Sequence, residues 1–184
     1  MTNLIETLKN VASTYVDNEK KNPLHVGEVM NLWTYMAMLN EANRFTEIGL
    51  NSTNDSELIE VLEHSFVDCS KQIQDINELF KKESITVPPT SDRKPRTDPN
   101  SIPLGVKMTD DEIANGISLK LITAIGFCAQ GLSQSLRTDV GAMWTKFLNM
   151  RIQFNAYFNP IMRKRGWVKV PPYYYPIGAQ SKPQ

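Results

Sequence analysis

Four long segments with helical periodicity are separated by connections of very unequal length, and this spacing constrains the fold more than any other feature. The apolar pattern predicts helices at about residues 24–50, 55–82, 109–137 and 139–165. A few polar residues separate the first helix from the second and the third from the fourth, and such short links make antiparallel hairpins. Between the second and third helices lie 26 residues, 83–108, which hold five of the chain's 11 prolines.

This proline-rich segment decides the predicted topology. A helix of about 27 residues is roughly 40 Å long, whereas 26 extended residues can reach roughly 80 Å. Segment 83–108 can therefore cross the whole bundle. Two hairpins joined by one long crossover are the connection of ferritin-like four-helix bundles. We predict an all-α fold, with this bundle at residues 23–165.

Local signals mark several helix boundaries. Thr109 and Glu112 have the spacing of a capping box at the start of the third helix. Pro160 should kink or divide the fourth helix, and Gly166 should end it. The expected core stripe of the second helix follows steps of three and four residues: Leu62, Phe66, Cys69, Ile73, Ile76 and Phe80.

Two appendages flank the predicted bundle. Residues 1–22 repeat the helical pattern weakly and are expected to form a short extra helix on the bundle or on a partner. Residues 166–184 are rich in proline and tyrosine. We expect them to form an extended strap packed on the bundle surface.

Composition indicates one soluble domain inside the cell. The chain has 184 residues and zero net charge, so it lacks the basic patch typical of nucleic-acid binding. Two cysteines are too few for a disulfide framework. The N-terminus lacks the apolar run of a signal peptide, and we expect no membrane span. These features predict a cytoplasmic protein.

The charges are unevenly distributed along the chain. Residues 1–108 carry 16 acidic and 11 basic side chains, and residues 109–184 carry 4 and 9. The two halves could neutralise each other within one bundle. They could also meet head to tail between subunits, and the sequence does not separate these alternatives.

Several short segments together resemble a known family. They are residues 23–33, 78–89, 110–114, 133–141 and 166–172. In this order they are similar to an uncharacterised ferritin-like family of spore-forming Firmicutes, which is distantly similar to spore coat proteins. The resemblance covers about residues 23–175. It implies a four-helix ferritin-like bundle, a link to sporulation and an open question of metal binding.

A ferritin-like di-metal centre needs inward carboxylates and histidines from all four helices. Between Ile113 and Arg165 the only carboxylate is Asp139, at the predicted turn, and the chain has two histidines in all. Most of the ligands from the third and fourth helices are therefore missing. We do not expect a conventional di-iron oxidase, and we identify no catalytic residues.

A reduced metal site is the remaining candidate. His25 and Glu28 are three residues apart and point toward the core at the start of the first helix, where they could bind iron, manganese or zinc. The alternative is structural: the two side chains cap this helix or bind the turn at residues 137–139. On the second helix, His64, Asp68 and Asp75 are expected to be solvated, with Gln72 at the flank of the apolar stripe.

These observations lead to ranked hypotheses for function. The first is a non-enzymatic structural or interaction protein associated with sporulation. The second is a metal-binding or redox bundle that uses His25 and Glu28. The outer apolar residues of the third helix (Leu119, Ile122 and Phe127) could in addition form a homodimer surface.

Overall fold

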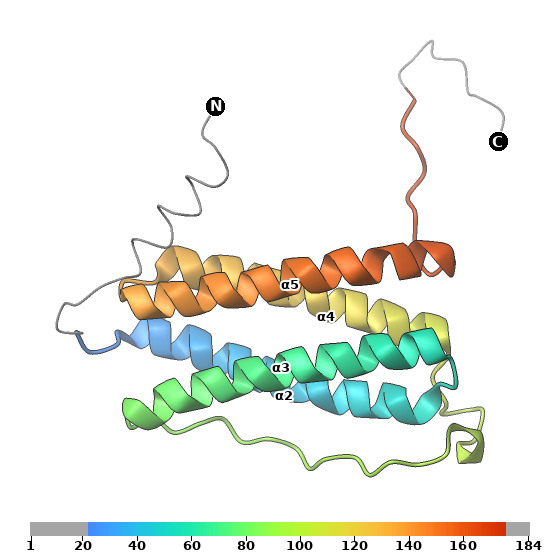
Figure 1. Cartoon of the computed structure of the whole chain (residues 1–184), viewed down its shortest axis with the longest axis horizontal. Coiled ribbons are helices and arrows are strands. Elements are labelled where there is room, and N and C mark those ends of the chain that lie inside the picture. Colours follow the sequence, from blue (N-terminus) through green and yellow to red (C-terminus); the bar gives the residue numbers. More distant parts are fainter. Residues whose placement is uncertain (1–21, 176–184) are drawn as a thin grey trace.

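The computed structural model describes residues 22–175, and these residues form four long helices without a β-strand (Figure 1). The helices are α2 (Val26–Ser52), α3 (Ser56–Lys82), α4 (Asp110–Gln134) and α5 (Thr138–Lys164), with one short 3-10 turn, η1 (Pro99–Ser101). The all-helical fold class is thus as predicted. The helix expected within residues 1–22 lies outside the described residues, apart from Asn22.

The starts of the helices agree with the local signals in the sequence. Thr109 caps α4 through the predicted capping box, in which its hydroxyl accepts from the Glu112 amide and Glu112 accepts from the Thr109 amide. Asp55 caps α3 in a similar way by accepting from the Leu58 amide at 2.9 Å. For α3 and α4 the capping hydrogen bond therefore comes from the residue just before the helix, whereas Arg137 before α5 makes no such side-chain bond.

The end of α4 corrects one prediction. The third helix was expected to reach residue 137, but α4 ends at Gln134, because the amides of Leu136 and Arg137 bond to the Glu28 carboxylate of α2 instead of continuing the helix. Of the two outcomes predicted for Pro160, a division of α5 does not occur, because the helix continues through this residue to Lys164. Gly166 ends this helix as predicted: its φ is 69°, and the Trp167 amide donates back to the Met162 carbonyl.

The contacts at the two ends of the bundle establish its topology. At one end, Arg137 before α5 pairs with Glu83 after α3, and at the other end Arg165 after α5 pairs with Glu57 at the start of α3. Helices α3 and α5 are therefore antiparallel, as are the hairpin pairs α2–α3 and α4–α5 (Figure 1). The structure thus consists of two hairpins joined by one long connection.

The crossover at residues 83–108 runs along the length of the bundle beside α2 and α3 (Figure 1). Glu47 of α2 accepts from Arg93 Nε and from the Lys94 amide, at 3.1 and 2.8 Å. Asn51 bonds to the main chain of the same segment on both of its amide atoms. Buried polar groups of α2 therefore hold this connection against the helices.

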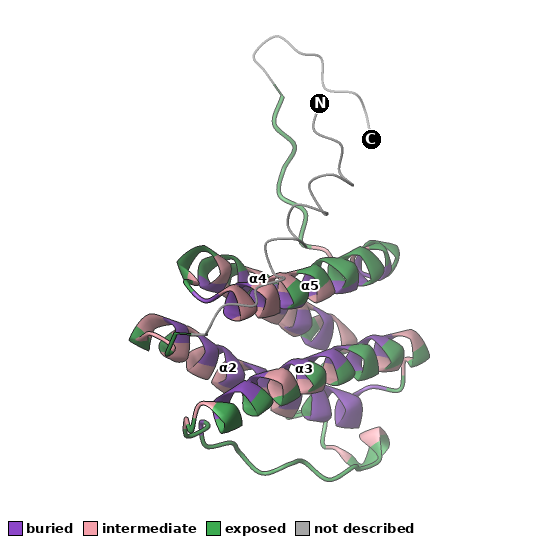
Figure 2. Ribbon diagram, turned by 60° about the vertical axis from the view of Figure 1, so that its left-hand side comes forward, coloured by how far each residue is buried: buried purple, intermediate pink, exposed green. Residues whose placement is uncertain are grey.

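The buried faces of the four helices point inward, as the ribbon coloured by burial shows (Figure 2). Small residues of α4 face large ones of α5: a β-carbon on Gly131 would collide with the Trp144 ring, which is completely buried. Only glycine allows the two helices to approach so closely at this point.

The inward face of α3 differs from the predicted stripe. Leu62, Cys69, Ile76 and Phe80 are buried as expected, but Phe66 and Ile73 are only half-buried. Phe66 instead packs against the crossover, where the Arg93 guanidinium lies 5.6 Å from its ring centre. The core face of α3 carries three polar residues in their place: Ser65, Asp68 and Gln72.

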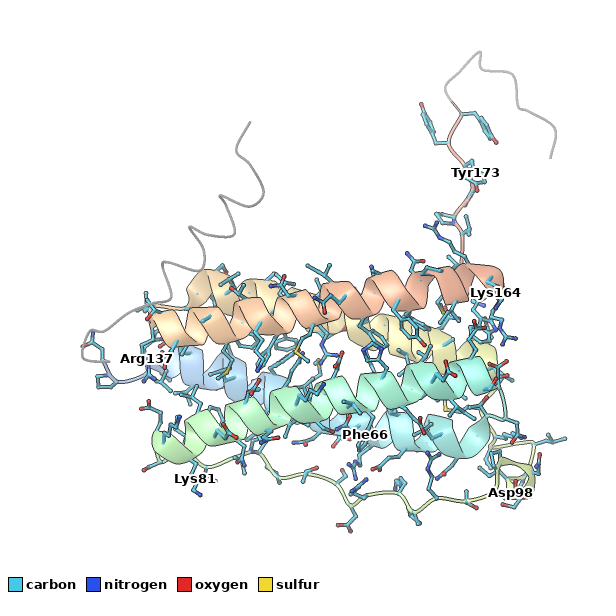
Figure 3. The ribbon with its side chains drawn as sticks, viewed as in Figure 1. Phe66, Lys81, Asp98, Arg137, Lys164 and Tyr173 are labelled. Carbon is cyan, nitrogen blue, oxygen red and sulfur yellow. The ribbon has the colours of Figure 1, made fainter. Side chains whose placement is uncertain are left out.

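The C-terminal segment packs on the bundle only at its beginning. Trp167 is buried, and its carbonyl accepts from the Asn115 side chain at 3.1 Å. Lys169 is exposed and pairs with Asp111 of α4 at 2.8 Å. Residues 170–175 are exposed and lead away from the helices, with Tyr173 far from the bundle surface (Figure 3). The prediction of a packed strap is therefore wrong for residues 170–175, and residues 176–184 lie outside the described residues.

Helix α4 is the one described helix that is long and apolar enough to cross a membrane by these two criteria. No such segment was predicted from the sequence. This finding is weak evidence for a membrane protein, because the core helix of a bundle passes the same test.

Candidate functional site

The two residues predicted as metal ligands lie together at the start of α2. His25 is the cap residue: its Nδ1 accepts from the Gly27 amide at 2.9 Å, which places the ring proton on Nε2, 3.3 Å from the Gln134 carbonyl oxygen. Glu28 is 2% exposed, and its Oε2 lies 3.8 Å from His25 Nε2. The expected proximity is therefore present.

The Glu28 carboxylate is already engaged with main-chain amides. Its Oε2 accepts from the His25 amide at 3.2 Å, and its Oε1 accepts from the amides of Leu136 and Arg137, each at 2.9 Å. Glu28 thus caps its own helix and also holds the turn between α4 and α5. The structural alternative from the sequence is confirmed on both counts, and a metal ion at this position would compete with three main-chain donors.

Arg137 lies at the same end of the bundle (Figure 3) and extends this contact into a network. Its guanidinium donates to Asp139 through Nε and Nη2, and to Glu83 through Nη1 at 2.7 Å. These contacts, led by the hydrogen bonds to Asp139, raise the pKa of Arg137. The network joins the start of α2, the end of α3 and the α4–α5 turn, so we assign it a role in holding the bundle together.

A second polar cluster lies at mid-height in the core, centred on Arg151 of α5. Arg151 is 3% exposed, and its guanidinium donates to Gln72 Oε1 at 2.6 Å, to Tyr35 Oη at 3.3 Å and to Cys69 Sγ at 3.5 Å. Tyr35 donates in turn to Gln72 Oε1 at 2.7 Å, and Cys128 donates to Tyr35. The cluster therefore contains residues from all four helices.

The charge of this cluster is unusual for a protein core. Burial raises the pKa values of Tyr35 and Cys128, which keeps both groups neutral. No described Asp or Glu forms an ion pair with Arg151. A buried guanidinium without a carboxylate partner carries a desolvation cost that neutral hydrogen bonds offset only in part.

The mid-bundle position is where a ferritin-like protein holds its di-metal centre. Carboxylates and imidazoles are required there, whereas this chain provides a guanidinium, a phenol, an amide and two thiols. The positive charge of Arg151 would repel a metal cation. Within residues 22–175 no group of three or more His, Cys, Asp or Glu side chains could hold a metal ion. The residues present do not fit a di-metal centre.

Most of this cluster was not predicted from the sequence. Tyr35 was not considered, and Gln72 was placed at the flank of the apolar stripe, although it is fully buried. The signal was available: Ser65, Cys69, Gln72 and Ile76 follow the three- and four-residue steps of one helical face. Because Ser65 and Gln72 are polar, these positions do not stand out as an apolar stripe.

One further expectation for α3 is corrected. Asp68 was expected to be solvated, yet it is buried and pairs with His64 at 3.4 Å. The His64 ring lies edge-on to the buried Phe154 ring, at 5.3 Å between centres. Asp75 is partly exposed and pairs with Lys146 at 2.6 Å.

The outer surface of α4 carries the residues predicted for a dimer contact. Leu119 and Ile122 are 66% and 65% exposed. Phe127 does not belong to this surface, because it is half-buried and its ring lies 5.9 Å from that of Tyr35. The exposed apolar part of α4 is therefore smaller than predicted.

Comparison with known proteins identifies the family. The family described as "Protein of unknown function (DUF3231)" matches residues 14–178 of the chain. The chain belongs to this family. The resemblance noted from short segments of the sequence to an uncharacterised family is thus confirmed.

Two relatives extend this result for the DUF3231 chain. The uncharacterized protein YvdQ of Bacillus subtilis (strain 168) is 27% identical over 155 residues, which cover 84% of this chain and 91% of YvdQ. A crystal structure of a candidate spore coat protein from Bacillus halodurans C-125 is similar with a TM-score of 0.82 and 27% identity. That match covers 84% of this chain and 98% of the solved one.

Proposed function

We propose that this DUF3231 protein is a non-enzymatic structural or interaction protein of ferritin-like connectivity that becomes associated with the spore after synthesis in the cytoplasm. The observation that carries the proposal is the similarity to the candidate spore coat protein of Bacillus halodurans, which extends over 98% of that chain at a TM-score of 0.82.

The chemistry of the core supports this proposal. Several groups that could do acid–base or redox work are tied into the two polar clusters: Glu28 holds the α4–α5 turn, and Tyr35 and Cys69 contact Arg151. Such side chains position helices. The same bundle that houses metals in other proteins would serve here as a rigid scaffold.

Localisation during sporulation tests the proposal directly. The chain would be fused to a fluorescent protein and expressed in sporulating Bacillus subtilis, whose YvdQ is 27% identical to it. We expect fluorescence to collect around the developing spore, and the protein to appear in coat extracts of washed spores. Fluorescence that stays uniform in the mother cell, with no protein in the coat extract, would contradict the proposal.

The exposed apolar residues of α4 suggest how copies of the chain would associate. We propose a homodimer through Leu119 and Ile122, which expose about two thirds of their side chains. Light scattering should report a dimer for the wild type and a monomer for the double variant Leu119→Arg, Ile122→Arg. Ile152→Arg is the matched control, because Ile152 is an exposed apolar residue of α5. A monomeric wild type at high concentration would refute the dimer.

The alternative function is metal binding at His25 and Glu28, for which the favourable observation is the 3.8 Å between His25 Nε2 and Glu28 Oε2. Iron, manganese and zinc would be measured in purified untagged protein and in the variant Glu28→Gln. Metal in stoichiometric amount that is lost in the variant would establish the alternative and contradict the scaffold as the whole function. We expect no stoichiometric metal in either protein.

A further inference from the structure

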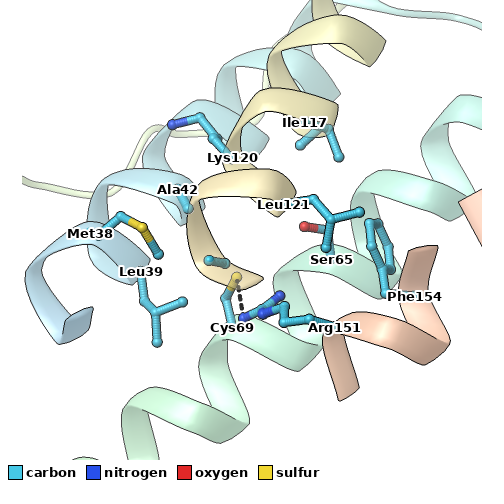
Figure 4. Close-up of a pocket in the computed structure, with 11 residues that line it drawn as sticks. Met38, Leu39, Ala42, Ser65, Cys69, Ile117, Lys120, Leu121, Arg151 and Phe154 are labelled. Atoms are coloured by element: carbon cyan, nitrogen blue, oxygen red, sulfur yellow. Dashed lines mark hydrogen bonds between the residues drawn. The ribbon is translucent and has the colours of Figure 1, made fainter. Parts of the chain in front are cut away.

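A small cavity adjoins the Arg151 cluster and lies between the four helices (Figure 4). Its volume is about 20 Å³, which is room for a water molecule or for one ion of similar size. Arg151, Ser65 and Cys69 line it together with Lys120 of α4 and apolar side chains. Among the described residues that line it, two are cationic and none is acidic.

Two hydrogen-bond donors at this cavity have no partner among residues 22–175. All three hydrogen bonds donated by Arg151 use Nε and Nη2, which leaves Nη1 free. Ser65 is 7% exposed, and its hydroxyl makes no hydrogen bond with any described residue. In Figure 4 this hydroxyl and the Arg151 guanidinium lie on adjacent sides of the same space. Buried donors of this kind normally have an acceptor.

Lys120 adds positive charge at the rim of the cavity without filling it. Its Nζ lies over the Phe45 ring, 4.7 Å from the ring centre, and points away from Arg151 (Figure 4). The ammonium is thus held near the cavity by the aromatic face. Its charge favours an anion over a neutral molecule in the cavity.

We propose that this cavity binds a monovalent anion of chloride size, with Arg151 Nη1 and the Ser65 hydroxyl as its direct ligands. The anion supplies the negative charge that the core lacks around Arg151, and it satisfies both free donors. Only a compact anion suits a cavity of about 20 Å³. This inference does not depend on the association with spores.

The direct test is crystallographic. Crystals of the full chain would be soaked in sodium bromide, since bromide replaces chloride and is located by its anomalous scattering. A bromide peak within hydrogen-bond distance of Arg151 Nη1 and Ser65 Oγ is the expected result. Bromide peaks on the protein surface with none in the cavity would overturn the proposal. The competing source of negative charge, a Cys69 thiolate, would give this second outcome.

A measurement in solution shows whether the anion binds at moderate concentration. The midpoint of thermal unfolding would be followed in sodium chloride and in sodium gluconate of equal ionic strength. Chloride should raise the midpoint of the wild type, and Ser65→Ala should require about tenfold more chloride for the same effect, because one hydrogen bond to an ion is lost. Ser70→Ala is the matched control: the Ser70 hydroxyl lies on the same helix but bonds to the Phe66 carbonyl.

The bromide soak and the chloride titration together either establish the anion site or contradict it. A chloride response that is the same in wild type, Ser65→Ala and Ser70→Ala contradicts the proposal. This holds even with a bromide peak in the crystal, which would then reflect binding at crystal concentration only. A response that is reduced in Ser65→Ala alone, with bromide in the cavity, establishes the site.

Discussion

Replacement of Glu28 by glutamine tests the central claim about the end of the bundle. The Glu28 carboxylate is almost completely buried and accepts from three main-chain amides, at 3.2 Å from His25 and at 2.9 Å from both Leu136 and Arg137. Glutamine has nearly the same shape but no charge. The substitution therefore changes the hydrogen bonds and leaves the packing almost intact.

The expected loss of stability follows from these contacts. A hydrogen bond to a charged group contributes about 1.5–3 kcal/mol, whereas a neutral one contributes about 0.5–1.5 kcal/mol. With its oxygen toward Leu136 and Arg137, glutamine keeps two weaker bonds, and its NH2 group then faces the His25 amide, which is also a donor. One lost bond and two weakened bonds together predict a decrease of about 4–5 kcal/mol in the free energy of unfolding.

Urea unfolding followed by circular dichroism measures this quantity. Glu41→Gln is the matched control, because Glu41 is an exposed residue of the same helix and, among residues 22–175, accepts a hydrogen bond only from the Ser91 hydroxyl. The control should change the stability by less than about 0.5 kcal/mol. A loss below about 1 kcal/mol for Glu28→Gln, or an equal loss in both variants, would refute the assigned role. The wild-type midpoint should also be unchanged by a metal chelator.

Three more predictions concern packing, pH and thiol reactivity. Gly131→Ala should destabilise the protein by about 2 kcal/mol or more, because the added methyl group collides with the buried indole ring of Trp144. Gly126→Ala should instead stabilise it by about 0.5–1 kcal/mol, because no atom lies within 4 Å of the added methyl group and alanine favours the helix over glycine. The capping hydrogen bonds lower the pKa of Glu112 below its ordinary value of 4.5. The ionised Glu112 side chain therefore contributes its full stabilisation at pH values above 4.5. This contribution is lost as the pH falls through the lower pKa of the folded state. The urea concentration at the midpoint of unfolding should decrease as the pH is lowered below 4.5, and it should decrease less in Glu112→Gln. The buried thiols of Cys69 and Cys128 should resist a thiol reagent in the native protein and react after unfolding.

Each of these predictions has a contradicting result. Equal effects of alanine at the two glycines would show that α4 and α5 do not approach closely at residue 131. An acid profile unchanged by Glu112→Gln would show that the capping box does not form in solution. Fast labelling of either cysteine in the native protein would place that thiol outside the core.

Signals close together in the sequence predicted most of the fold. The capping box of Thr109 and the glycine stop at Gly166 each depend on residues within a few positions of each other, and both are present in the structure. The crossover at residues 83–108 followed from its length, because a chain that long can connect two parallel helices. The end of α4 was missed because its competitor, Glu28, lies 108 positions from Leu136.

Of the two candidate sites, the one at the end of the bundle was predictable from the sequence and the one in the core was not. The positions of His25 and Glu28 on one helical face were predictable, since residues three apart share a face. The composition of the cluster around Arg151 was not, because its partners Tyr35 and Gln72 come from two other helices, and Gln72 was placed at the flank of the apolar stripe of α3. A small error in the rotation of one helix changes which side chains reach the centre of a bundle.

The sequence by itself determined four helices, their hairpin pairing and a long crossover, because periodicity, caps and connection length are properties of neighbouring residues. Only the tertiary structure decided that Glu28 holds a turn more than 100 positions away and that Arg151 occupies the core without a carboxylate partner among the described residues. These features arise from the rotation and approach of whole helices, which depend on contacts along their entire buried faces.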